Sequence, residues 1–316
     1  MTSVETVNNA VATIGFFDGV HKGHQFVVRQ VVDEARRRGL QAVSVTFDRP
    51  PREVLTGRPC PLLTTLDEKK SLLLQAGADR CEILPFTPEL AALSAKDFML
   101  KILKNRLNVK VLMLGYDNRF GHREPCGGEH FDDDLRCVGE LGMELIRLPE
   151  KEVPEVSAKC SSSSVRKALG EGDVGLAAEL LGRPYRVAGR VVHGRGEGRR
   201  LNFPTANLAP ETIATVIPAT GVYAVRVRTA GETDGESPEK GRIGMMNIGT
   251  RPTFDGDTLS LEVHLFHFSG NLYGQRLAVD FLRRVRDEQA FSSPEALRRQ
   301  LEKDRISIIS EFNPSI

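Results

Sequence analysis

The stretch IGFFDGVHKGHQ, residues 14–25, joins an apolar run to a helix-like segment and decides how the first half of the chain is expected to fold. The apolar run predicts a buried strand, and apolar side chains then recur at helical spacing through residues 26–35. Gly39 follows at a position where helices commonly end. Because DGVHKG is too rich in glycine and charge to be helical, we expect the helix to begin near Gly23 or His24.

His21 and His24 would then lie at the start of this helix, three residues apart and on one face. The unpaired N–H groups and the dipole of a helix N-terminus favour an anion there. Gly23, which has no side chain, lets the backbone approach a ligand closely. The arrangement suits a polyphosphate, although an isolated H-x-G-H pattern is equally typical of a surface loop.

The rest of the first half repeats the alternation of strand and helix. Short apolar runs predict strands, and amphipathic stretches between them predict helices. Continuous apolar strands in this rhythm indicate a parallel sheet covered on both faces, so we predict a doubly wound, Rossmann-like α/β domain. The expected strands are 41–47, 80–86, 109–116 and 143–149, and the expected helices are 65–77, with Thr65 as its cap, and 94–107.

After about residue 183, strand-like segments follow one another with turns between them instead of helices. This pattern predicts a small antiparallel β-barrel, followed by a terminal helix that Ser293 caps. We therefore expect two domains, 1–183 and 184–316. The expected barrel strands are 185–194, 221–230, 241–249, 259–268 and 277–286, with a hairpin loop at 231–241.

Composition narrows the class of protein. The chain has 316 residues, 40% hydrophobic and 27% charged, with a net charge of +1. This charge balance does not indicate binding to nucleic acid, and no apolar run approaches the length needed to cross a membrane. The five cysteines form no C-x-x-C pair, which predicts reduced thiols and a cytoplasmic location. The N-terminal ten residues lack the features of a secretory signal.

A second phosphate-type signal lies in CSSSSVRKALGEG, residues 160–172. Serine hydroxyls precede a helical turn that carries Arg166, one turn beyond Ser162. Serines at this position are commonly just helix caps. Together with the first stretch, the segment is expected to form the opposite side of a nucleotide site.

The third constellation is HGRGEGRRLNFPTANL, residues 193–208. A glycine-rich loop between strands is often only a turn. Thr205 and Asn207, however, carry hard oxygen ligands of the kind that Mg²⁺ accepts alongside phosphates and water. In LSLEVHLFHF, Glu262 points away from the apolar face that Leu261 and Val263 share.

These motifs resemble those of the bacterial bifunctional riboflavin kinase/FAD synthetase family. Residues 15–24, 114–124 (LGYDNRFGHRE) and 161–166 (SSSSVR) are similar to three signatures of its adenylyltransferase domain, in the family's order. PTAN at 204–207 resembles the signature of riboflavin kinase, and residues 244–254 and 261–266 also match that half. Class I aminoacyl-tRNA synthetases use a similar H-x-G-H loop, but the sequence has neither a K-M-S-K-S-like loop nor a basic tRNA-binding extension.

The resemblance implies an enzyme that phosphorylates riboflavin to FMN, releasing ADP, and then transfers AMP from ATP to FMN, giving FAD and pyrophosphate. It implies Mg²⁺ as cofactor and ATP as co-substrate, with no nucleic-acid or membrane partner. Glu262 would be the general base of the kinase, while the histidines and Arg166 would neutralise phosphate charge. The implied site residues are the catalytic His21, His24, Arg166 and Glu262; the nucleotide-binding Gly15, Phe16, Asp18, Gly23, Asp117, Arg123, Ser161, Ser162, Gly194 and Gly196; the flavin-binding Arg286 and Asp287; and the metal-binding Thr205 and Asn207.

Several positions depart from the family's patterns. Pro50 stands where a histidine is common, Asn202 stands where a glycine commonly precedes F-P-T-A-N, and Asn118 and Arg119 replace a commoner aromatic pattern. Two alternatives follow: a chain in which only the kinase works, and a flavin or nucleotide sensor without catalysis. Because binding alone does not require a base together with phosphate clamps, the sensor is the weaker interpretation.

Overall fold

The computed structural model describes residues 9–115, 138–148, 160–194, 196–229, 241–253 and 256–312. The chain divides into two compact units, Met1–Cys160 and Ser161–Ile316. Among the described helices, none is long and apolar enough to cross a membrane. The predicted site residues Asp117 and Arg123, and the departures Asn118 and Arg119, lie outside the described residues.

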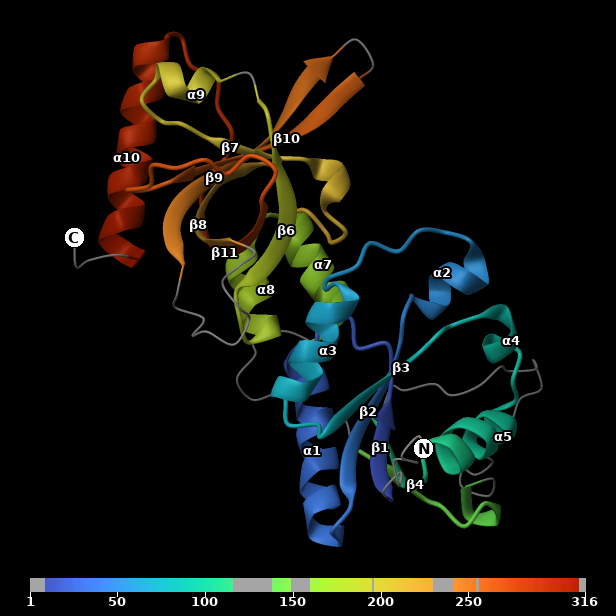
Figure 1. Ribbon diagram of the computed structural model, residues 1–316. Coiled ribbons are helices and arrows are strands. Elements are labelled where there is room, and N and C mark those ends of the chain that lie inside the picture. The colour runs from blue at the N-terminus through green and yellow to red at the C-terminus, as the bar shows by residue number, and fades with distance from the viewer. Residues whose placement is uncertain are drawn as a thin grey trace, which may run out of the picture. The chain divides into compact units, whose positions relative to one another are not determined.

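The first unit contains a five-stranded parallel sheet, as the alternation of apolar and amphipathic segments predicts (Figure 1). The spatial order β3–β2–β1–β4–β5 places β1, the strand before the H-x-G-H loop, at the centre. The strands are β1 (Ala10–Ile14), β2 (Gln41–Phe47), β3 (Arg80–Leu84), β4 (Val109–Leu114) and β5 (Glu144–Arg147).

Helices connect these strands, and the predicted caps are confirmed. Gly39 ends the first helix in the left-handed conformation, with φ of 67°, and the Thr65 hydroxyl accepts the N–H of Glu68. The short helix α2 was not predicted; it begins after Pro50, the N-cap, because Pro51 suits a first helical position. The helices are α1 (Lys22–Arg38), α2 (Pro51–Thr56), α3 (Leu66–Gln75), α4 (Pro88–Ala91), α5 (Ala95–Phe98) and the π-helix η1 (Met99–Arg106).

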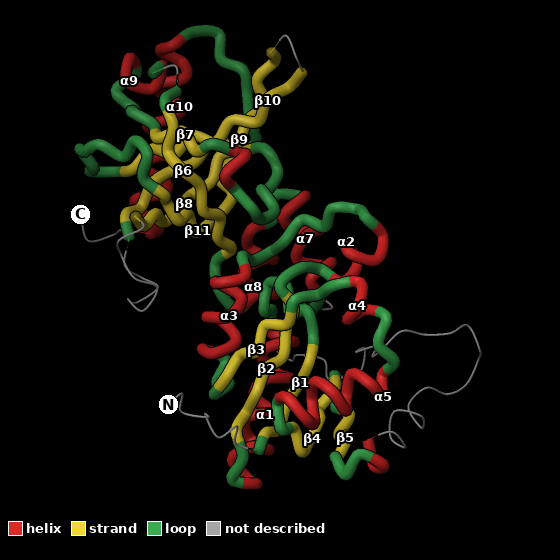
Figure 2. The backbone as a smooth tube through the Cα atoms, turned by 45° about the vertical axis from the view of Figure 1, so that its right-hand side comes forward, coloured by secondary structure: helices red, strands yellow, loops and turns green. Residues whose placement is uncertain are grey.

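Alternating side chains of β1 are buried in two separate hydrophobic cores, one on each face of the sheet. Val11 packs in the core that contains Val31 of α1 and Leu73 of α3. Ala12 packs in the core that contains Leu103 of η1. Figure 2 shows helices on both faces of the sheet, so the doubly wound prediction is confirmed.

The second unit begins with α7 (Ser162–Gly170) and α8 (Val174–Leu181), and α8 packs against strands of the barrel that follows. The predicted domain boundary at 183/184 places these two helices in the first domain, whereas in the structure they belong to the second compact unit. The closed barrel runs β10–β7–β6–β11–β8–β9. Its strands are β6 (Tyr185–Val192), β7 (Ala206–Leu208), β8 (Gly221–Thr229), β9 (Arg242–Thr253), β10 (Gly256–Leu265) and β11 (Arg276–Arg286).

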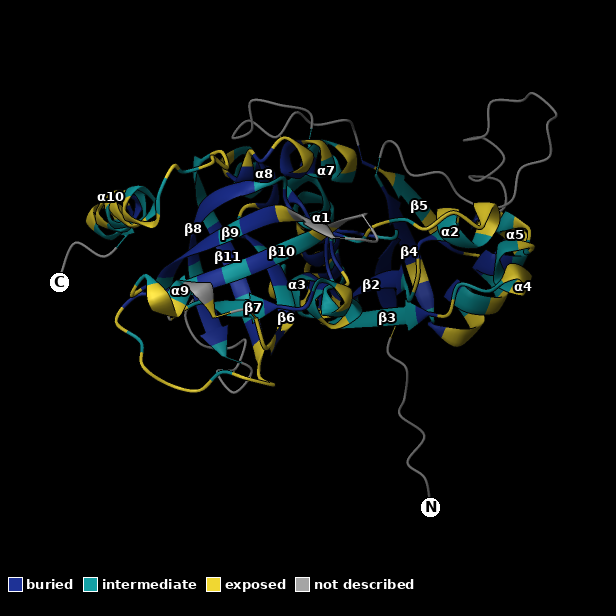
Figure 3. Ribbon diagram, turned by 90° about the horizontal axis from the view of Figure 1, so that it is seen from above, coloured by how far each residue is buried: buried dark blue, intermediate teal, exposed yellow. Residues whose placement is uncertain are grey.

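The predicted barrel is confirmed. Buried and less buried positions alternate along β6, whereas β8 is buried along most of its length (Figure 3). The strand β7 was missed because its three residues directly follow the P-T turn. The terminal helix α10 (Pro294–Phe312) begins where Ser293 accepts the N–H of Ala296, as predicted. Ile308 of α10 packs with Phe203 and Phe266 of the barrel, which makes the helix part of a local core.

Candidate functional site

The loop between β1 and α1 brings the two predicted histidines together. His21 is the N-cap of α1 rather than a helical residue, so the helix begins at Lys22, one or two residues earlier than predicted. The Nδ1 atom of His21 accepts the backbone N–H of His24 at 3.4 Å. The two rings stack with their centroids 3.6 Å apart. The predicted shared face is confirmed.

Gly23 allows this arrangement, because a Cβ at this position would lie only 3.1 Å from Nδ1 of His21. The sulfur of Cys160, the last residue of the first unit, lies 3.5 Å from the same nitrogen. Burial raises the pKa of the Cys160 thiol, while the N–H groups of Lys22 and Gly23 act in the opposite direction. The first N–H groups of α1 thus already have acceptors: Nδ1 of His21 for His24, and the Cys160 sulfur for Lys22 and Gly23.

The loop itself is held in an unusual conformation. Phe17 and the β-branched Val20 have φ of 54° and 41°, in the left-handed region that side chains other than glycine rarely adopt. Buried Asp18 accepts the N–H groups of Leu63 at 2.9 Å and of Thr64 at 3.3 Å. These bonds let Asp18 hold the shape of the loop.

His24 is kept neutral by its surroundings. Burial lowers its pKa well below the usual value, and the charges of His21 and Lys69 lower it further. Its Nδ1 is shielded and has no hydrogen-bond partner in the described part of the chain. Its ring stands perpendicular to that of Phe17, with the two centroids 5.2 Å apart. A buried nitrogen without a partner is a candidate contact for a ligand.

This environment makes the stability of the first unit depend on pH. In the unfolded chain His24 takes up a proton near pH 6.5, whereas the folded unit resists the proton to a much lower pH. We expect the free energy of unfolding to fall by up to about 1 kcal/mol per pH unit as pH drops below about 6.5. Thermal unfolding of the wild type and of His24→Gln between pH 8 and pH 5 measures this. An identical pH dependence in both proteins would contradict it.

Lys69 was not predicted as a site residue; it is only 3% exposed although it lies on α3. Its Nζ donates to the carbonyls of Phe16 at 3.1 Å and of Phe47 at 2.7 Å. Burial lowers the pKa of this amine to about 8, against the opposing effect of nearby carboxylates, Asp18 first. An amphipathic pattern cannot reveal such a residue, because a lysine on a helix is normally solvated.

The serine segment forms the start of α7 in the second unit. Ser161 is the N-cap, and its hydroxyl accepts the N–H of Ser164 at 3.1 Å. Ser162 is the first helical residue, and Arg166 lies one turn further along. The capping role is therefore present, and a phosphate-binding role for these residues stays a prediction.

In the barrel, the predicted kinase residues lie close together at β7 and β10, with Thr205 immediately before β7. The hydroxyl of Thr205 donates to Oε2 of Glu262 at 3.1 Å. Asn207 lies directly opposite Glu262 across the β7–β10 ladder. Asn247 of β9 lies opposite Glu262 on the other side, and this residue was not among those predicted. Glu262 thus faces away from buried Leu261 and Val263, as its position in the strand predicted.

The glycine-rich loop lies against the side chains of Asn207 and Thr205. A Cβ on Gly194 would lie 2.7 Å from Oδ1 of Asn207 and closer still to the rest of that carboxamide. A Cβ on Gly198 would lie 3.2 Å from the hydroxyl of Thr205. Gly196, with φ of 74°, precedes the single-turn helix α9 (Glu197–Arg200). The glycines therefore leave room for the side chains that were predicted to bind the metal.

Asn202 explains one departure from the family pattern, since its φ is 63°. Glycine adopts this conformation freely, and asparagine is among the few other residues that tolerate it. We expect Asn202→Gly to change stability by less than about 0.5 kcal/mol, whereas Asn202→Val should cost about 1–2 kcal/mol. Chemical denaturation of the two variants measures the difference. Equal stability would show that the conformation of residue 202 does not matter.

Two cavities meet at Thr205. One, of about 280 Å³, is lined by Glu262 and Asn247, by the rings of Phe203, His264 and Phe291, and by Arg286. The other, of about 500 Å³, is lined by Arg199, Ala206, Phe268 and Tyr273. Since Thr205 lines both, a group bound in one cavity can approach a group bound in the other at this residue.

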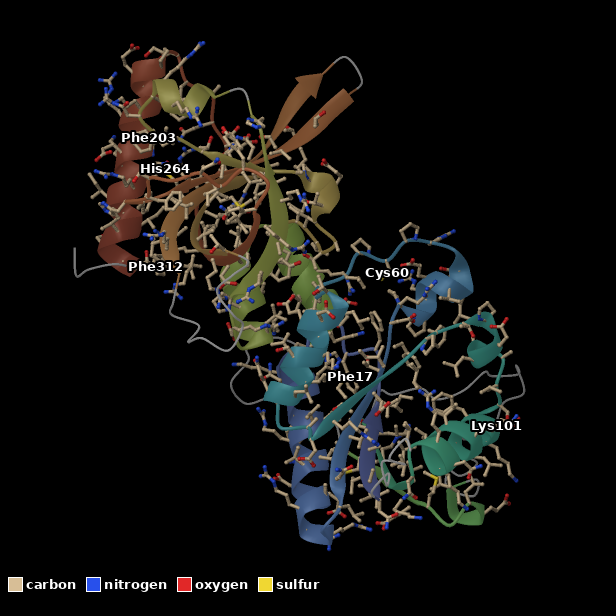
Figure 4. All side chains as sticks on the ribbon, in the orientation of Figure 1. Phe17, Cys60, Lys101, Phe203, His264 and Phe312 are labelled. Atoms are coloured by element: carbon tan, nitrogen blue, oxygen red, sulfur yellow. The ribbon has the colours of Figure 1, made fainter. Side chains whose placement is uncertain are left out.

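The two residues predicted to contact flavin differ in their surroundings. Arg286 lines the smaller cavity, and its Nε donates to buried Asp304 of α10 at 2.9 Å. Asp287 is largely exposed and pairs with Arg284 at 2.9 Å. Asp287 is not among the residues that line the cavity. His264, which was not predicted, lines the cavity and lies 2.8 Å from the carbonyl of Pro204 (Figure 4).

Family models and known proteins indicate the same family for this chain. A model described as "Riboflavin kinase" matches residues 181–310, and one described as "FAD synthetase" matches residues 3–163. A bifunctional riboflavin kinase/FMN adenylyltransferase of Escherichia coli K12 is 37% identical, over 94% of this chain and 91% of that protein. The protein of the same description from Bacillus subtilis is 35% identical, over 96% and 93%. A solved structure described as a macrolide-efflux protein from Streptococcus pneumoniae is 31% identical, covers 97% of this chain and 95% of its own, and has a TM-score of 0.82.

Proposed function

Because the chain belongs to the family of bifunctional riboflavin kinase/FMN adenylyltransferases, we propose that the residues described above carry its two reactions, one in the barrel and one beside the parallel sheet. The chain phosphorylates riboflavin with ATP to give FMN and ADP. It then transfers AMP from ATP to FMN, which gives FAD and pyrophosphate. The family models match the two halves of the chain in separate ranges, so the two chemistries belong to different halves.

The kinase assignment rests on the contact between Thr205 and Glu262 at the point where the two cavities meet. Riboflavin would occupy the smaller cavity, whose rings suit a flat aromatic system, and ATP would occupy the larger one. Glu262 would accept the proton of the ribityl hydroxyl as its oxygen attacks the γ-phosphorus, and ADP would leave. Arg286, fixed by Asp304, would hold the flavin side of the cavity.

Thr205 and Asn207 fit a magnesium ion in the kinase site. Their side-chain oxygens are hard ligands, and the lack of a side chain at Gly194 leaves room for the carboxamide of Asn207. The described residues contain no cluster of three or more histidine, cysteine or acidic side chains that could hold a metal, so phosphate and water would complete the coordination. When bound, Mg²⁺ would neutralise charge on the transferred phosphate.

The adenylyltransferase site would use the loop before α1. An oxygen of the FMN phosphate would attack the α-phosphorus of ATP and expel pyrophosphate, which requires no protein nucleophile and no proton transfer. His21 and His24 would stabilise charge at the α-phosphate and the leaving group. Ser161, Ser162 and Arg166 would bind the β and γ side. This assignment rests on the resemblance of SSSSVR at 161–166 to the signature of the family.

Asp117 and Arg123 remain proposed nucleotide contacts outside the described residues, and Gly15 and Phe16 remain proposed contacts of the loop. A cytoplasmic location is also part of the proposal. The five cysteines of the sequence form no C-x-x-C pair, which supports a reducing compartment.

A time course with riboflavin, ATP and Mg²⁺ tests the proposal, with the three flavins separated by chromatography. FMN should rise first and then convert to FAD, and EDTA should stop both steps. FMN that accumulates without FAD would indicate a chain in which only the kinase works. Binding of flavin without turnover would indicate a sensor.

A further inference from the structure

Lys69 places a buried ammonium behind the adenylyltransferase loop, where the two reactions above give it no role. It bonds the carbonyl of Phe16, which follows β1, and the carbonyl of Phe47, which ends the neighbouring strand β2. In doubly wound sheets, ligands bind at the carboxyl ends of the strands. Lys69 therefore links two strand ends at the edge of the sheet where the phosphates of ATP are proposed to bind.

The Phe16 carbonyl is held from two directions. Besides Lys69, the hydroxyl of buried Thr46 donates to the same oxygen at 3.0 Å. The ammonium also lies 4.0 Å from the centre of the Phe16 ring, within range of a cation–π interaction. The peptide group that joins Phe16 to Phe17 is thus fixed in orientation immediately before the left-handed residue Phe17.

This fixation matters because the loop conformation is intrinsically unfavourable. Residues such as Phe17 and Val20 persist at positive φ only where the surrounding structure overdetermines them. Asp18 holds the loop through the N–H groups of Leu63 and Thr64, and Lys69 with Thr46 holds its beginning. Between these restraints and the start of α1, the loop carries His21 as the helix cap.

The charge of Lys69 is also retained against a desolvation cost. Burial disfavours the ammonium, as its pKa of about 8 reflects. An apolar side chain at the same position would avoid this cost. A buried charge that is kept at a desolvation cost and holds the backbone of a ligand loop supports a functional role.

We propose that Lys69 is a positioning residue for adenylyl transfer, whose ammonium, together with the Thr46 hydroxyl, fixes the Phe16 carbonyl and so presents His21 and His24 to the phosphates of ATP. The inference rests on the proposed role of the two histidines. Because small displacements of catalytic groups can slow a reaction about 100-fold, loss of this restraint should appear in the rate of the chemical step.

The test compares Lys69→Met, Thr46→Val and Thr46→Ser in the full chain. Lys69→Met should lower kcat for FMN adenylation about 10- to 100-fold, while the same molecules phosphorylate riboflavin at the wild-type rate. Thr46→Val keeps the shape of the side chain and removes the hydroxyl, so adenylation should fall severalfold. Thr46→Ser keeps the hydroxyl and loses a buried methyl, so it should be less stable but nearly as active as the wild type.

The threonine pair separates positioning from stability. If Lys69 and Thr46 served stability alone, adenylation in the threonine variants would follow their thermal unfolding temperatures, and this would overturn the inference. Wild-type adenylation in both Lys69→Met and Thr46→Val would also overturn it, provided that His21→Ala is inactive. If His21→Ala were also fully active, the proposed role of the histidines would fail instead. Should Lys69→Met not fold, the comparison of Thr46→Val with Thr46→Ser decides.

Discussion

Replacing Glu262 with glutamine is expected to slow riboflavin phosphorylation by about 10²- to 10⁴-fold and to leave FMN adenylation unchanged. Glutamine retains the size of the side chain and can still accept the hydroxyl of Thr205, whose contact with Glu262 is 3.1 Å long. It cannot accept a proton from the ribityl hydroxyl, which must lose one to attack the γ-phosphorus. Steady-state formation of FMN from riboflavin, with FAD formation from supplied FMN assayed separately, measures both effects.

Two further variants make this result specific. Glu302→Gln removes a carboxylate from α10 of the same unit. Glu302 pairs with Arg305 and lines neither cavity, so phosphorylation should be unaffected. Thr205→Val should weaken phosphorylation through loss of the hydroxyl beside Glu262 and the proposed metal. An active Glu262→Gln enzyme would exclude Glu262 as the base. Equal loss of both activities would point to a general folding defect.

The architecture was predictable because burial leaves periodic traces in the sequence. The run 42–47 of β2, apolar except for Ser44 and Thr46, reflects a strand with helices on both faces. The alternation in β10 reflects a barrel strand with one buried face. The helix caps Thr65 and Ser293 were predicted from local hydrogen-bonding chemistry. The segment α2 and the strand β7 were missed because each is too short to develop a period.

The candidate site was predictable only where chemistry depends on neighbouring residues in the sequence. His21 and His24 are joined by one turn, and Thr205 and Asn207 belong to one short segment. Asn247 and Lys69 reach their sites through strand pairing and through a helix that packs over strand ends, contacts that no local pattern encodes. Asp18 likewise bonds the backbone of Leu63, which lies 45 residues away in the sequence, so no local pattern predicts this contact.

Replacing His21 or His24 with alanine is expected to lower FAD formation from FMN by about 10²- to 10³-fold and to spare FMN formation from riboflavin. Removal of one preorganised donor from a site where phosphate charge develops has an effect of this size. In His21, Nδ1 accepts the His24 N–H, so a neutral ring carries its proton on Nε2 and can donate it to phosphate. Assays with FMN and ATP as the supplied substrates isolate this step from the kinase.

The geometry of the His21 ring also distinguishes its two nitrogens. Glutamine places an N–H near the position of Nε2, whereas asparagine places a polar atom near Nδ1, the atom that caps α1. If phosphate contact is the main role of His21, His21→Gln should retain more FAD formation than His21→Asn. If capping is the main role, the order should reverse and follow thermal stability. Full activity in both His21→Ala and His24→Ala would show that neither histidine stabilises charge on the phosphates, and would remove both from the mechanism.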